Sequence, residues 1–201
     1  PQYYVELVNK CNADCVFCTY PIMKDLGKPL VSMNDTLFDQ AITIIKQEKR
    51  SNISLTPTTG EIFMHKNWDK YINKILKLDF VKNVQFYSNA ALLNEKNRNK
   101  FFELPFLNKM KIDFSTGGID SQTYKTLFGQ DLFDKVESNI NYFLLELKKR
   151  KLKIPVGIDI KLLSNQKLKP KQCRAIYNKY NYNYVLIKLR RKYDDLGGNI
   201  N

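Results

Sequence analysis

The stretch YYVELVNKCNADCVFC (residues 3–18) joins a strand-like run to three closely spaced cysteines. Tyr3–Val8 is rich in aromatic and β-branched residues, which predicts a short β-strand. Cys11, Cys15 and Cys18 follow it in a C-x3-C-x2-C spacing. Such a cluster is unlike the even, dispersed cysteines of a small secreted fold. It indicates a reducing compartment, which we expect to be the cytoplasm, and a metal-binding or catalytic role.

The spacing of the three cysteines favours an iron–sulfur cluster. Spacers of three and two residues let one loop turn all three thiolates towards a common point, and such clusters prefer thiolate ligands. A [4Fe–4S] cluster held in this way would keep one iron open for another ligand. A zinc site would need a fourth ligand from His65 or Cys173, neither of which belongs to a second ligand pair. Buried cysteines without a metal are the remaining alternative.

The composition is that of a globular chain with an excess of basic residues. Its 201 residues are enough for one domain with a sizeable core, and 43% of them are hydrophobic. No apolar run is long enough to span a membrane and no signal peptide opens the chain, so we expect no membrane partner. The net charge of +13 would suit nucleic acid, but only six of the 33 basic residues are Arg. We therefore expect a solvated basic surface and no nucleic-acid partner.

Strand-like and helix-like segments alternate along the chain. After Tyr3–Val8, further strands are predicted at residues 52–57, 84–88, 110–115, 154–162 and 184–189. Helices are predicted from Asn34 or Asp35 onward and near residues 68–78, 94–103, 132–150 and 169–180. This alternation predicts one α/β domain with a mostly parallel sheet. An open doubly wound sheet and a partial (β/α) barrel are both compatible with it.

Polar residues gather where the predicted strands end. Thr58–Glu61 follows the second strand, Ser88–Asn89 ends the third, and Ser115–Gly117 ends the fourth. In both candidate folds the active face lies at the carboxyl ends of parallel strands. The sequence therefore predicts that these residues and the cysteines meet at one site.

The C-x3-C-x2-C motif after the first strand of such a chain resembles the radical S-adenosylmethionine (radical SAM) enzymes. The resemblance covers essentially the whole chain and implies a partial (β/α)6 barrel over residues 1–190. It implies that Cys11, Cys15 and Cys18 hold a [4Fe–4S] cluster whose fourth iron binds S-adenosylmethionine. The implied reaction is reductive cleavage of that cofactor to a 5′-deoxyadenosyl radical, which abstracts hydrogen from a substrate. An external electron donor such as flavodoxin is implied as a partner.

Other positions match the same family. Phe17 lies where the family places an aromatic residue beside the adenine. Thr59-Gly60-Glu61 resembles the family's Gly-Gly-Glu motif, whose backbone and carboxylate receive the methionine ammonium. The chain departs from that motif at Thr59, and at Ile62, where Pro often follows. A glycine permits close backbone approach and a glutamate accepts from a cationic amine, so the chemistry agrees with the match.

Two further turns resemble cofactor-binding turns of the family less closely. Ser88-Asn89 is similar to its Thr-Asn-Gly sequence, with Ala90 in place of the glycine. Ser115 is similar to the serine of the turn after the fourth strand and implies a contact to the cofactor's carboxylate or ribose. Each of these turns would, on its own, be read as an ordinary turn.

The substrate is predicted from weaker signals. LTPTTGE (residues 55–61) and DDLGGNIN (residues 194–201) resemble the SPASM-containing branch, whose members often modify peptides or proteins. We expect an excised domain in which residues 191–201 begin a linker to a missing C-terminal extension. A peptide or protein is the expected substrate, and a small molecule, a sugar or nucleic acid is the alternative. A non-catalytic iron–sulfur or zinc module is distinguished by whether Glu61 and Ser115 face the cysteines.

Three kinds of residue stay undecided at this level. Asp113 and Asp159 lie inside predicted strands, where a charge is costly unless it is paired. They would meet a polar substrate or Lys161 if they point into the barrel, but alternation alone does not decide the face. His65, the only histidine, is expected to be a packing or solvated residue, and Cys173 a structural thiol.

Overall fold

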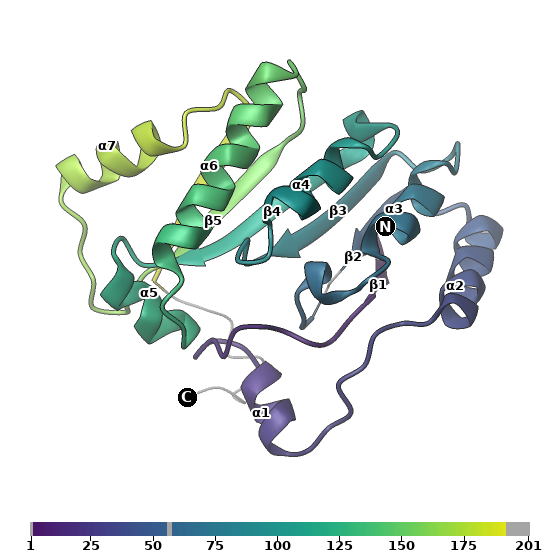
Figure 1. The fold of residues 1–201 in the computed structure, drawn as a ribbon, viewed down its shortest axis with the longest axis horizontal. Coiled ribbons are helices and arrows are strands. Elements are labelled where there is room, and N and C mark those ends of the chain that lie inside the picture. Colours follow the sequence, from purple (N-terminus) through teal and green to yellow (C-terminus); the bar gives the residue numbers. More distant parts are fainter. Residues whose placement is uncertain (1, 56–57, 192–201) are drawn as a thin grey trace.

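Six parallel strands form one sheet in the computed structural model, which describes residues 2–55 and 58–191. The strands are β1 (Gln2–Val5), β2 (Asn52–Leu55), β3 (Asn83–Ser88), β4 (Met110–Gly117), β5 (Val156–Lys161) and β6 (Val185–Arg190). They lie side by side in their order along the chain (Figure 1). A doubly wound sheet reverses its strand order at a switch point. The sequential order therefore selects the partial barrel from the two predicted folds.

The helices follow the predicted alternation and add short elements. They are α1 (Tyr20–Asp25), α2 (Asp35–Glu48), α3 (Trp68–Leu76), α4 (Glu95–Phe102), α5 (Ser121–Phe128), α6 (Phe133–Lys149) and α7 (Pro170–Lys179), with 3-10 turns η1 (Ile62–Met64) and η2 (Leu107–Lys109). Asn34 caps α2 by accepting from the Leu37 backbone N–H at 2.9 Å, and Asn94 caps α4 from Asn97 at 3.0 Å. The sequence did not predict α1, α5 and the two 3-10 turns.

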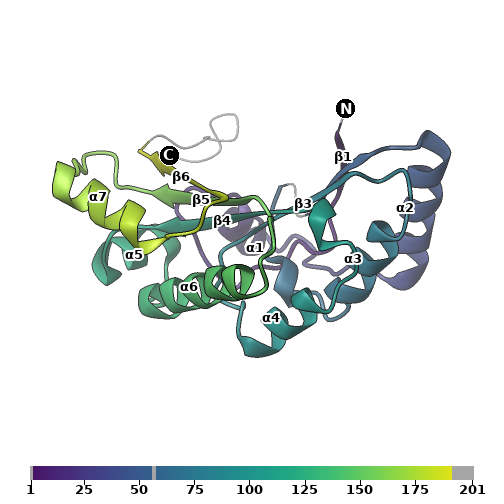
Figure 2. The same ribbon diagram turned by 90° about the horizontal axis from the view of Figure 1, so that it is seen from above.

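The two faces of the sheet differ in character. Helices α3, α4 and α6 lie on one face (Figure 2), where Phe114 of β4 meets Phe143 of α6 with ring centroids 5.5 Å apart. Ile112 and Phe114 point to this face and are buried. Because side chains alternate along a strand, Asp113 between them points to the opposite, open face. Asp159 lies on that open face too, since it pairs in register with Ser115.

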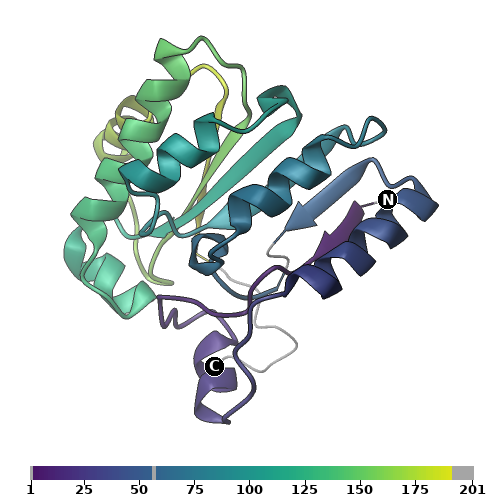
Figure 3. The ribbon, with the colours of Figure 1, turned by 45° about the vertical axis from the view of Figure 1, so that its right-hand side comes forward.

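Helix α1 lies apart from the helical layer, beyond the carboxyl ends of the strands (Figures 1 and 3). It belongs to the long segment between β1 and α2 that also carries the cysteines. The polar end of the sheet is therefore covered by irregular chain and not by the main helices.

The strand bounds refine the expectations at both ends of the chain. β1 ends at Val5, three residues earlier than predicted, and Val8 instead forms an isolated antiparallel bridge with Ser32. Most of the expected linker, residues 192–201, lies outside the described residues, as do Thr56 and Pro57. Among the helices of the described residues, none is both long enough and apolar enough to cross a membrane.

Candidate functional site

A cavity of about 270 Å³ opens at the carboxyl ends of the strands. The predicted cluster ligands and cofactor-binding residues all line it, whereas Thr116 and Gly117 of the fourth strand end do not: the lining includes Cys11, Cys15, Phe17, Cys18, Thr59, Gly60, Glu61, Ser88, Asn89 and Ser115. These residues come from the cysteine loop and from the ends of three neighbouring strands. The parallel sheet therefore gathers residues that are more than a hundred positions apart in the sequence.

The base of the cysteine loop is fastened by the bridge between Val8 and Ser32. Asn9 strengthens this base, because its side chain donates to the Pro29 carbonyl at 3.0 Å and accepts from the Val31 N–H at 2.7 Å. Residues 10–28 thus leave and return at one point of the molecule. This closure explains why the first strand ends before Val8: the chain leaves the sheet to pair with the returning segment.

Helix α5 supports the cysteine loop from the other side. The Asp14 N–H donates to the Phe128 carbonyl at 3.2 Å, and the Val16 N–H donates to the Leu127 carbonyl at 3.0 Å. These carbonyls belong to the last turn of α5, where the carbonyl oxygens have no N–H donor within their own helix. Phe17 also packs edge-on against Phe128, with centroids 5.3 Å apart. The end of α5 therefore fixes both the backbone around Cys15 and the ring of Phe17.

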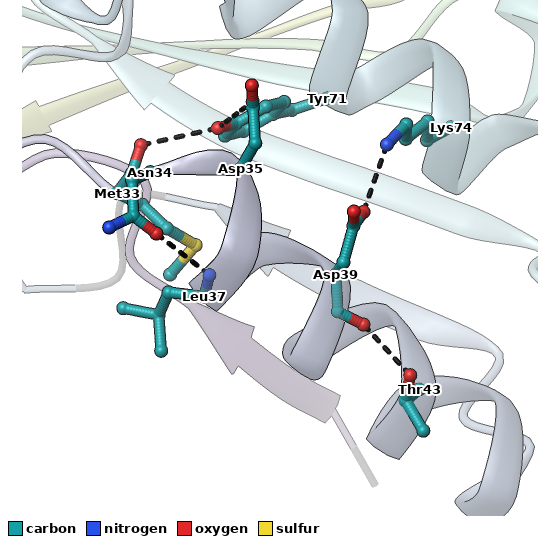
Figure 4. Close-up of polar contacts among 8 residues, drawn as sticks. All are labelled: Met33, Asn34, Asp35, Leu37, Asp39, Thr43, Tyr71 and Lys74. Atoms are coloured by element: carbon teal, nitrogen blue, oxygen red, sulfur yellow. Dashed lines mark hydrogen bonds and ion pairs between the residues drawn. The ribbon is translucent and has the colours of Figure 1, made fainter.

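His65 is a packing residue, as expected. It is 2% exposed, its Nε2 donates to the Met33 carbonyl at 2.8 Å, and its Nδ1 accepts from the Asn67 N–H at 3.1 Å. Both ring nitrogens are engaged, so no lone pair is left for zinc. The Met33 carbonyl also accepts from Tyr71, whose hydroxyl reaches Asp35 at 2.7 Å (Figure 4). This network joins the returning segment to α2 and α3.

The three cysteines share the chemistry of a cluster site. Burial is the largest cause that raises the pKa of all three thiols, and that of Cys11 reaches about 12. No group of three or more Cys, His, Asp or Glu side chains within residues 2–55 and 58–191 is arranged to hold a metal ion. The donor set nevertheless fits an iron–sulfur cluster chemically, since three thiols from one loop line one cavity. Cys173 lies on α7 and does not line this cavity.

Glu61 is a buried carboxylate whose hydrogen-bond donors within residues 2–55 and 58–191 are all neutral. It is 1% exposed. It accepts from the Ser88 hydroxyl at 2.8 Å, the Asn89 N–H at 2.7 Å and the Phe63 N–H at 3.3 Å. Burial raises the pKa of Glu61 to about 7, although these three hydrogen bonds lower it. A cationic ligand in the cavity would stabilise the charged form that burial disfavours.

Asn89 connects Glu61 to the cysteine loop. Its backbone N–H binds Glu61, while its side-chain Nδ2 donates to Asn12 Oδ1 at 3.0 Å and lies 3.7 Å from Cys11 Sγ. The next residue, Ala90, has a φ of 60°, in the left-handed region that favours glycine. The turn therefore has a backbone conformation that would suit the glycine of the resembled motif, although the residue here is alanine.

Gly60 holds the loop after β2 close to the chain that enters the cysteine loop. Its φ is +93°, and an added Cβ would lie 2.1 Å from the Val8 carbonyl oxygen. Only glycine fits this position. The preceding Thr59 is anchored by Glu6, whose carboxylate accepts from the Thr59 N–H at 3.1 Å and from its hydroxyl at 3.4 Å. Thr59 thus has its own anchor where the resembled motif has glycine.

The structure adds two cavity residues that the sequence interpretation missed, Tyr87 and Phe128, whereas Thr58 lines the cavity as its strand-end position predicted. Tyr87 precedes Ser88 and points to the open face of the sheet, which its place in the alternation would have indicated. Phe128 lies on the unpredicted α5, so no local pattern linked it to the cysteines. Glu6 was also missed, because its contact with Thr59 joins residues 53 positions apart.

No protein-family model matches the chain, and no curated protein matches it either. Solved structures do match its fold. The crystal structure of SuiB from Streptococcus suis, bound to the precursor peptide SuiA, has a TM-score of 0.68 at 15% identity. The match covers 99% of this chain and 40% of that one. SuiB also matches in a structure bound to S-adenosylmethionine.

Two other solved structures share the fold. A radical SAM methyltransferase from Sphaerobacter thermophilus has a TM-score of 0.65 at 12% identity, over 94% of this chain and 55% of that one. BtrN, in complex with AdoMet and 2-DOIA, has a TM-score of 0.51 at 15% identity, over 94% of this chain and 56% of that one. The chain has the partial-barrel fold of the radical SAM enzymes, as its sequence resemblance predicted. It spans between 40% and 56% of the length of the chains in these three structures.

Proposed function

We propose that this chain is the core domain of a radical SAM enzyme that acts on a peptide or protein. The observation that carries the proposal is the shared cavity: Glu61 and Ser115 line it together with Cys11, Cys15 and Cys18. A non-catalytic iron–sulfur module has no need of a buried carboxylate and a strand-end serine on the same wall. The arrangement therefore favours the enzyme over the binding module.

Within this proposal, the three cysteines hold a [4Fe–4S] cluster and the rest of the cavity holds S-adenosylmethionine. When bound, the cluster would supply one electron for reductive cleavage of the cofactor to methionine and a 5′-deoxyadenosyl radical. Glu61 binds the cofactor's ammonium, because the carboxylate is buried and its donors in the described part of the chain are neutral. Thr59, Gly60, Ser88 and Asn89 shape that pocket around Glu61.

Phe17 and Ser115 bind the remaining parts of the cofactor in this proposal. Phe17 offers its ring to the adenine, and its contact with Phe128 holds that ring in place. The Ser115 hydroxyl is available for the ribose or the carboxylate, since it lines the cavity from the neighbouring strand. An external reductant such as flavodoxin supplies the electron.

The substrate class rests on SuiB, which was solved with a precursor peptide and covers nearly all of this chain. BtrN was solved with 2-DOIA, so a small-molecule substrate is the second candidate. SuiB has the higher TM-score, 0.68 against 0.51, and this difference favours the peptide.

The test is anaerobic reconstitution with iron and sulfide, followed by reduction and assay of 5′-deoxyadenosine. We expect formation of this product with S-adenosylmethionine even without a substrate, at a low rate. Cys15→Ala should lose the cluster and the product, whereas Cys173→Ala should keep both. A fully loaded protein that forms no 5′-deoxyadenosine, or a Cys15→Ala variant that keeps its cluster, would contradict the proposal.

A further inference from the structure

Charged side chains lie beside the cavity on the open face of the sheet, next to two of its lining residues. Ser115 and Tyr87 line the cavity, and each has a strand neighbour in register: Asp159 beside Ser115 and Asp113 beside Tyr87. Register neighbours on parallel strands point to the same face. The two aspartates therefore lie directly next to the cavity, on the face that α3, α4 and α6 leave uncovered (Figure 2).

The two carboxylate oxygens of Asp159 differ in their contacts. Its Oδ2 lies 3.0 Å from Lys161 Nζ and 2.7 Å from Arg190 Nε. Its Oδ1 is buried and has no hydrogen-bond partner within residues 2–55 and 58–191. A buried carboxylate oxygen without a donor is costly. This atom therefore marks a place where a ligand that donates a hydrogen bond would be stabilised.

Lys161 joins this carboxylate to the cofactor side of the cavity. Its ammonium lies 3.0 Å from Asp159 and 5.7 Å from the centroid of the Phe17 ring, and its side chain is only 14% exposed. A group bound at Asp159 would thus lie beside Lys161, on the side of the sheet that leads to Phe17. Hydrogen abstraction needs this kind of closeness between substrate and cofactor.

Asp113 differs from Asp159, because neighbouring side chains contact its carboxylate. Its Oδ2 accepts from Gln85 Nε2 at 2.7 Å and lies 3.8 Å from Lys111 Nζ. Gly157 makes room for it, since a Cβ at that position would lie 2.0 Å from Asp113 Oδ1. Asp113 thus has its polar contacts within the sheet. Of the two aspartates, Asp159 is the one that offers an acceptor oxygen to a ligand.

The charges on this face indicate what kind of donor would bind. Four cations point to it, Lys111, Lys161, Lys188 and Arg190, against the two aspartates. This surplus disfavours a cationic donor at Asp159 and favours a neutral one next to an acceptor oxygen. A peptide amide has both: an N–H for Asp159 and a carbonyl for Lys161 or Arg190.

We propose that Asp159, Lys161 and Arg190 form the substrate subsite, in which Asp159 Oδ1 accepts from a backbone N–H of a peptide and the two cations bind a neighbouring carbonyl. This subsite rests on the proposed function, because it names how the same cavity would receive a peptide. It places the peptide against β5 and β6, next to Phe17.

The test uses the reconstituted chain with S-adenosylmethionine and a panel of blocked dipeptides, each acetylated at its amino end and amidated at its carboxyl end. Binding is measured by equilibrium dialysis, and a panel of sugars and hydroxy acids serves as the comparison. Asp159→Asn should weaken dipeptide binding roughly ten-fold, since it removes a hydrogen bond to a charged acceptor. The matched control is Glu146→Gln, which removes a surface carboxylate that also contacts two cations, Lys149 and Arg150.

Binding of dipeptides to wild type and to Glu146→Gln, together with the loss in Asp159→Asn, supports the subsite. Equal binding to Asp159→Asn, no dipeptide binding to wild type, or binding of the sugars and hydroxy acids alone overturns it. If Asp159→Asn fails to fold, as judged by circular dichroism, Lys161→Met serves in its place and should show the same loss. Cleavage of S-adenosylmethionine without any dipeptide tests the proposed function separately, so the two failures are distinguishable.

Discussion

Glu61 and Asp159 are two carboxylates in one partial barrel, and their surroundings are opposite. Glu61 lies at the end of the barrel, where the Ser88 hydroxyl and the backbone N–H groups of Asn89 and Phe63 provide three neutral donors. Asp159 lies on the strand face, where two cations contact one of its oxygens, while the other is buried without a hydrogen-bond donor among the described residues. The difference follows from position: a loop offers backbone N–H groups, whereas a strand inside a sheet offers only side chains.

The contrast indicates that the two carboxylates are suited to different kinds of ligand group. A carboxylate among neutral donors gains most from a cation, and a carboxylate already paired with cations gains most from a neutral donor. The first suits the ammonium of S-adenosylmethionine and the second suits a peptide amide. The predictions below test whether the two sites differ in the way that their neighbours imply.

The largest effect is expected at Gly60, which holds the Glu61 loop against the chain before the cysteines. Gly60→Ala would place a Cβ 2.1 Å from the Val8 carbonyl oxygen, so the backbone must move. We expect a loss of about 3 kcal/mol in the free energy of unfolding, measured in urea, and no detectable binding of S-adenosylmethionine.

Gly27→Ala is the matched control for this change. Gly27 also has a positive φ, +64°, but an added Cβ would meet nothing within 4 Å. The substitution introduces only backbone strain, so the free energy of unfolding should fall by about 1 kcal/mol. Equal losses for the two variants would show that close approach at Gly60 is not what positions Glu61.

The second-largest effect is expected in the pH dependence of the free energy of unfolding, which Glu61 influences. Burial raises its pKa to about 7 from the ordinary value of 4.5. Between these values the folded protein keeps a proton that the unfolded chain has released, so stability falls as pH rises. The loss begins above about pH 4.5 and is complete above about pH 7. Glu61→Gln lacks this loss, so its stability relative to wild type should rise by about 3 kcal/mol between pH 4 and pH 8.

This comparison is made on the protein without cofactor, by urea unfolding at each pH. Any constant cost of the glutamine's altered hydrogen bonds cancels, because only the change with pH is read. Added S-adenosylmethionine should shift the unfolding midpoint of reconstituted wild type and leave that of Glu61→Gln unchanged. A flat pH difference would mean that neutral donors alone keep the Glu61 carboxylate charged.

Asp159→Asn should act in the opposite direction on stability. The substitution removes the negative partner of Lys161 and Arg190, so the variant should be less stable than wild type by about 1 kcal/mol at neutral pH. Arg190 is half exposed, so added salt should reduce this difference. A stabilised variant would show that the ion pairs do not offset the cost of holding Asp159 in this place.

The sequence predicted the alternating elements well because they depend on local patterns. Asn34, one of the two predicted cap residues, stands before the apolar periodicity of α2 and caps that helix. Helix α5 was missed although its signals were present: Asp120 caps it by accepting from the Thr123 N–H at 2.8 Å, and Gly129 ends it with a φ of +69°. Its eight residues are too few for a clear apolar period.

The candidate site was predicted as a set because each residue lies at the carboxyl end of a strand or in the loop that follows the first strand, and these ends meet at one edge of a parallel sheet. The support around the site was not predictable, since it depends on contacts between distant parts of the chain. Glu6 anchors Thr59, and the carbonyls at the end of α5 receive the N–H groups of Asp14 and Val16. The orientation of Asp159 needed the register of β4 and β5, which no single strand contains.

The smallest effect is expected at Ala90, where the resembled turn has glycine. Ala90 has a φ of 60° and is fully buried, and its carbonyl accepts from Asn139 Nδ2 at 2.9 Å. Ala90→Gly relieves strain of about 1 kcal/mol but removes a buried methyl group worth about 0.8 kcal/mol. The two terms nearly cancel, so the free energy of unfolding should change by less than about 0.5 kcal/mol. A loss well above this value in urea unfolding would mean that the Ala90 methyl packs more tightly than its strain costs, which would make alanine the preferred residue beside the Asn89 contact to Glu61.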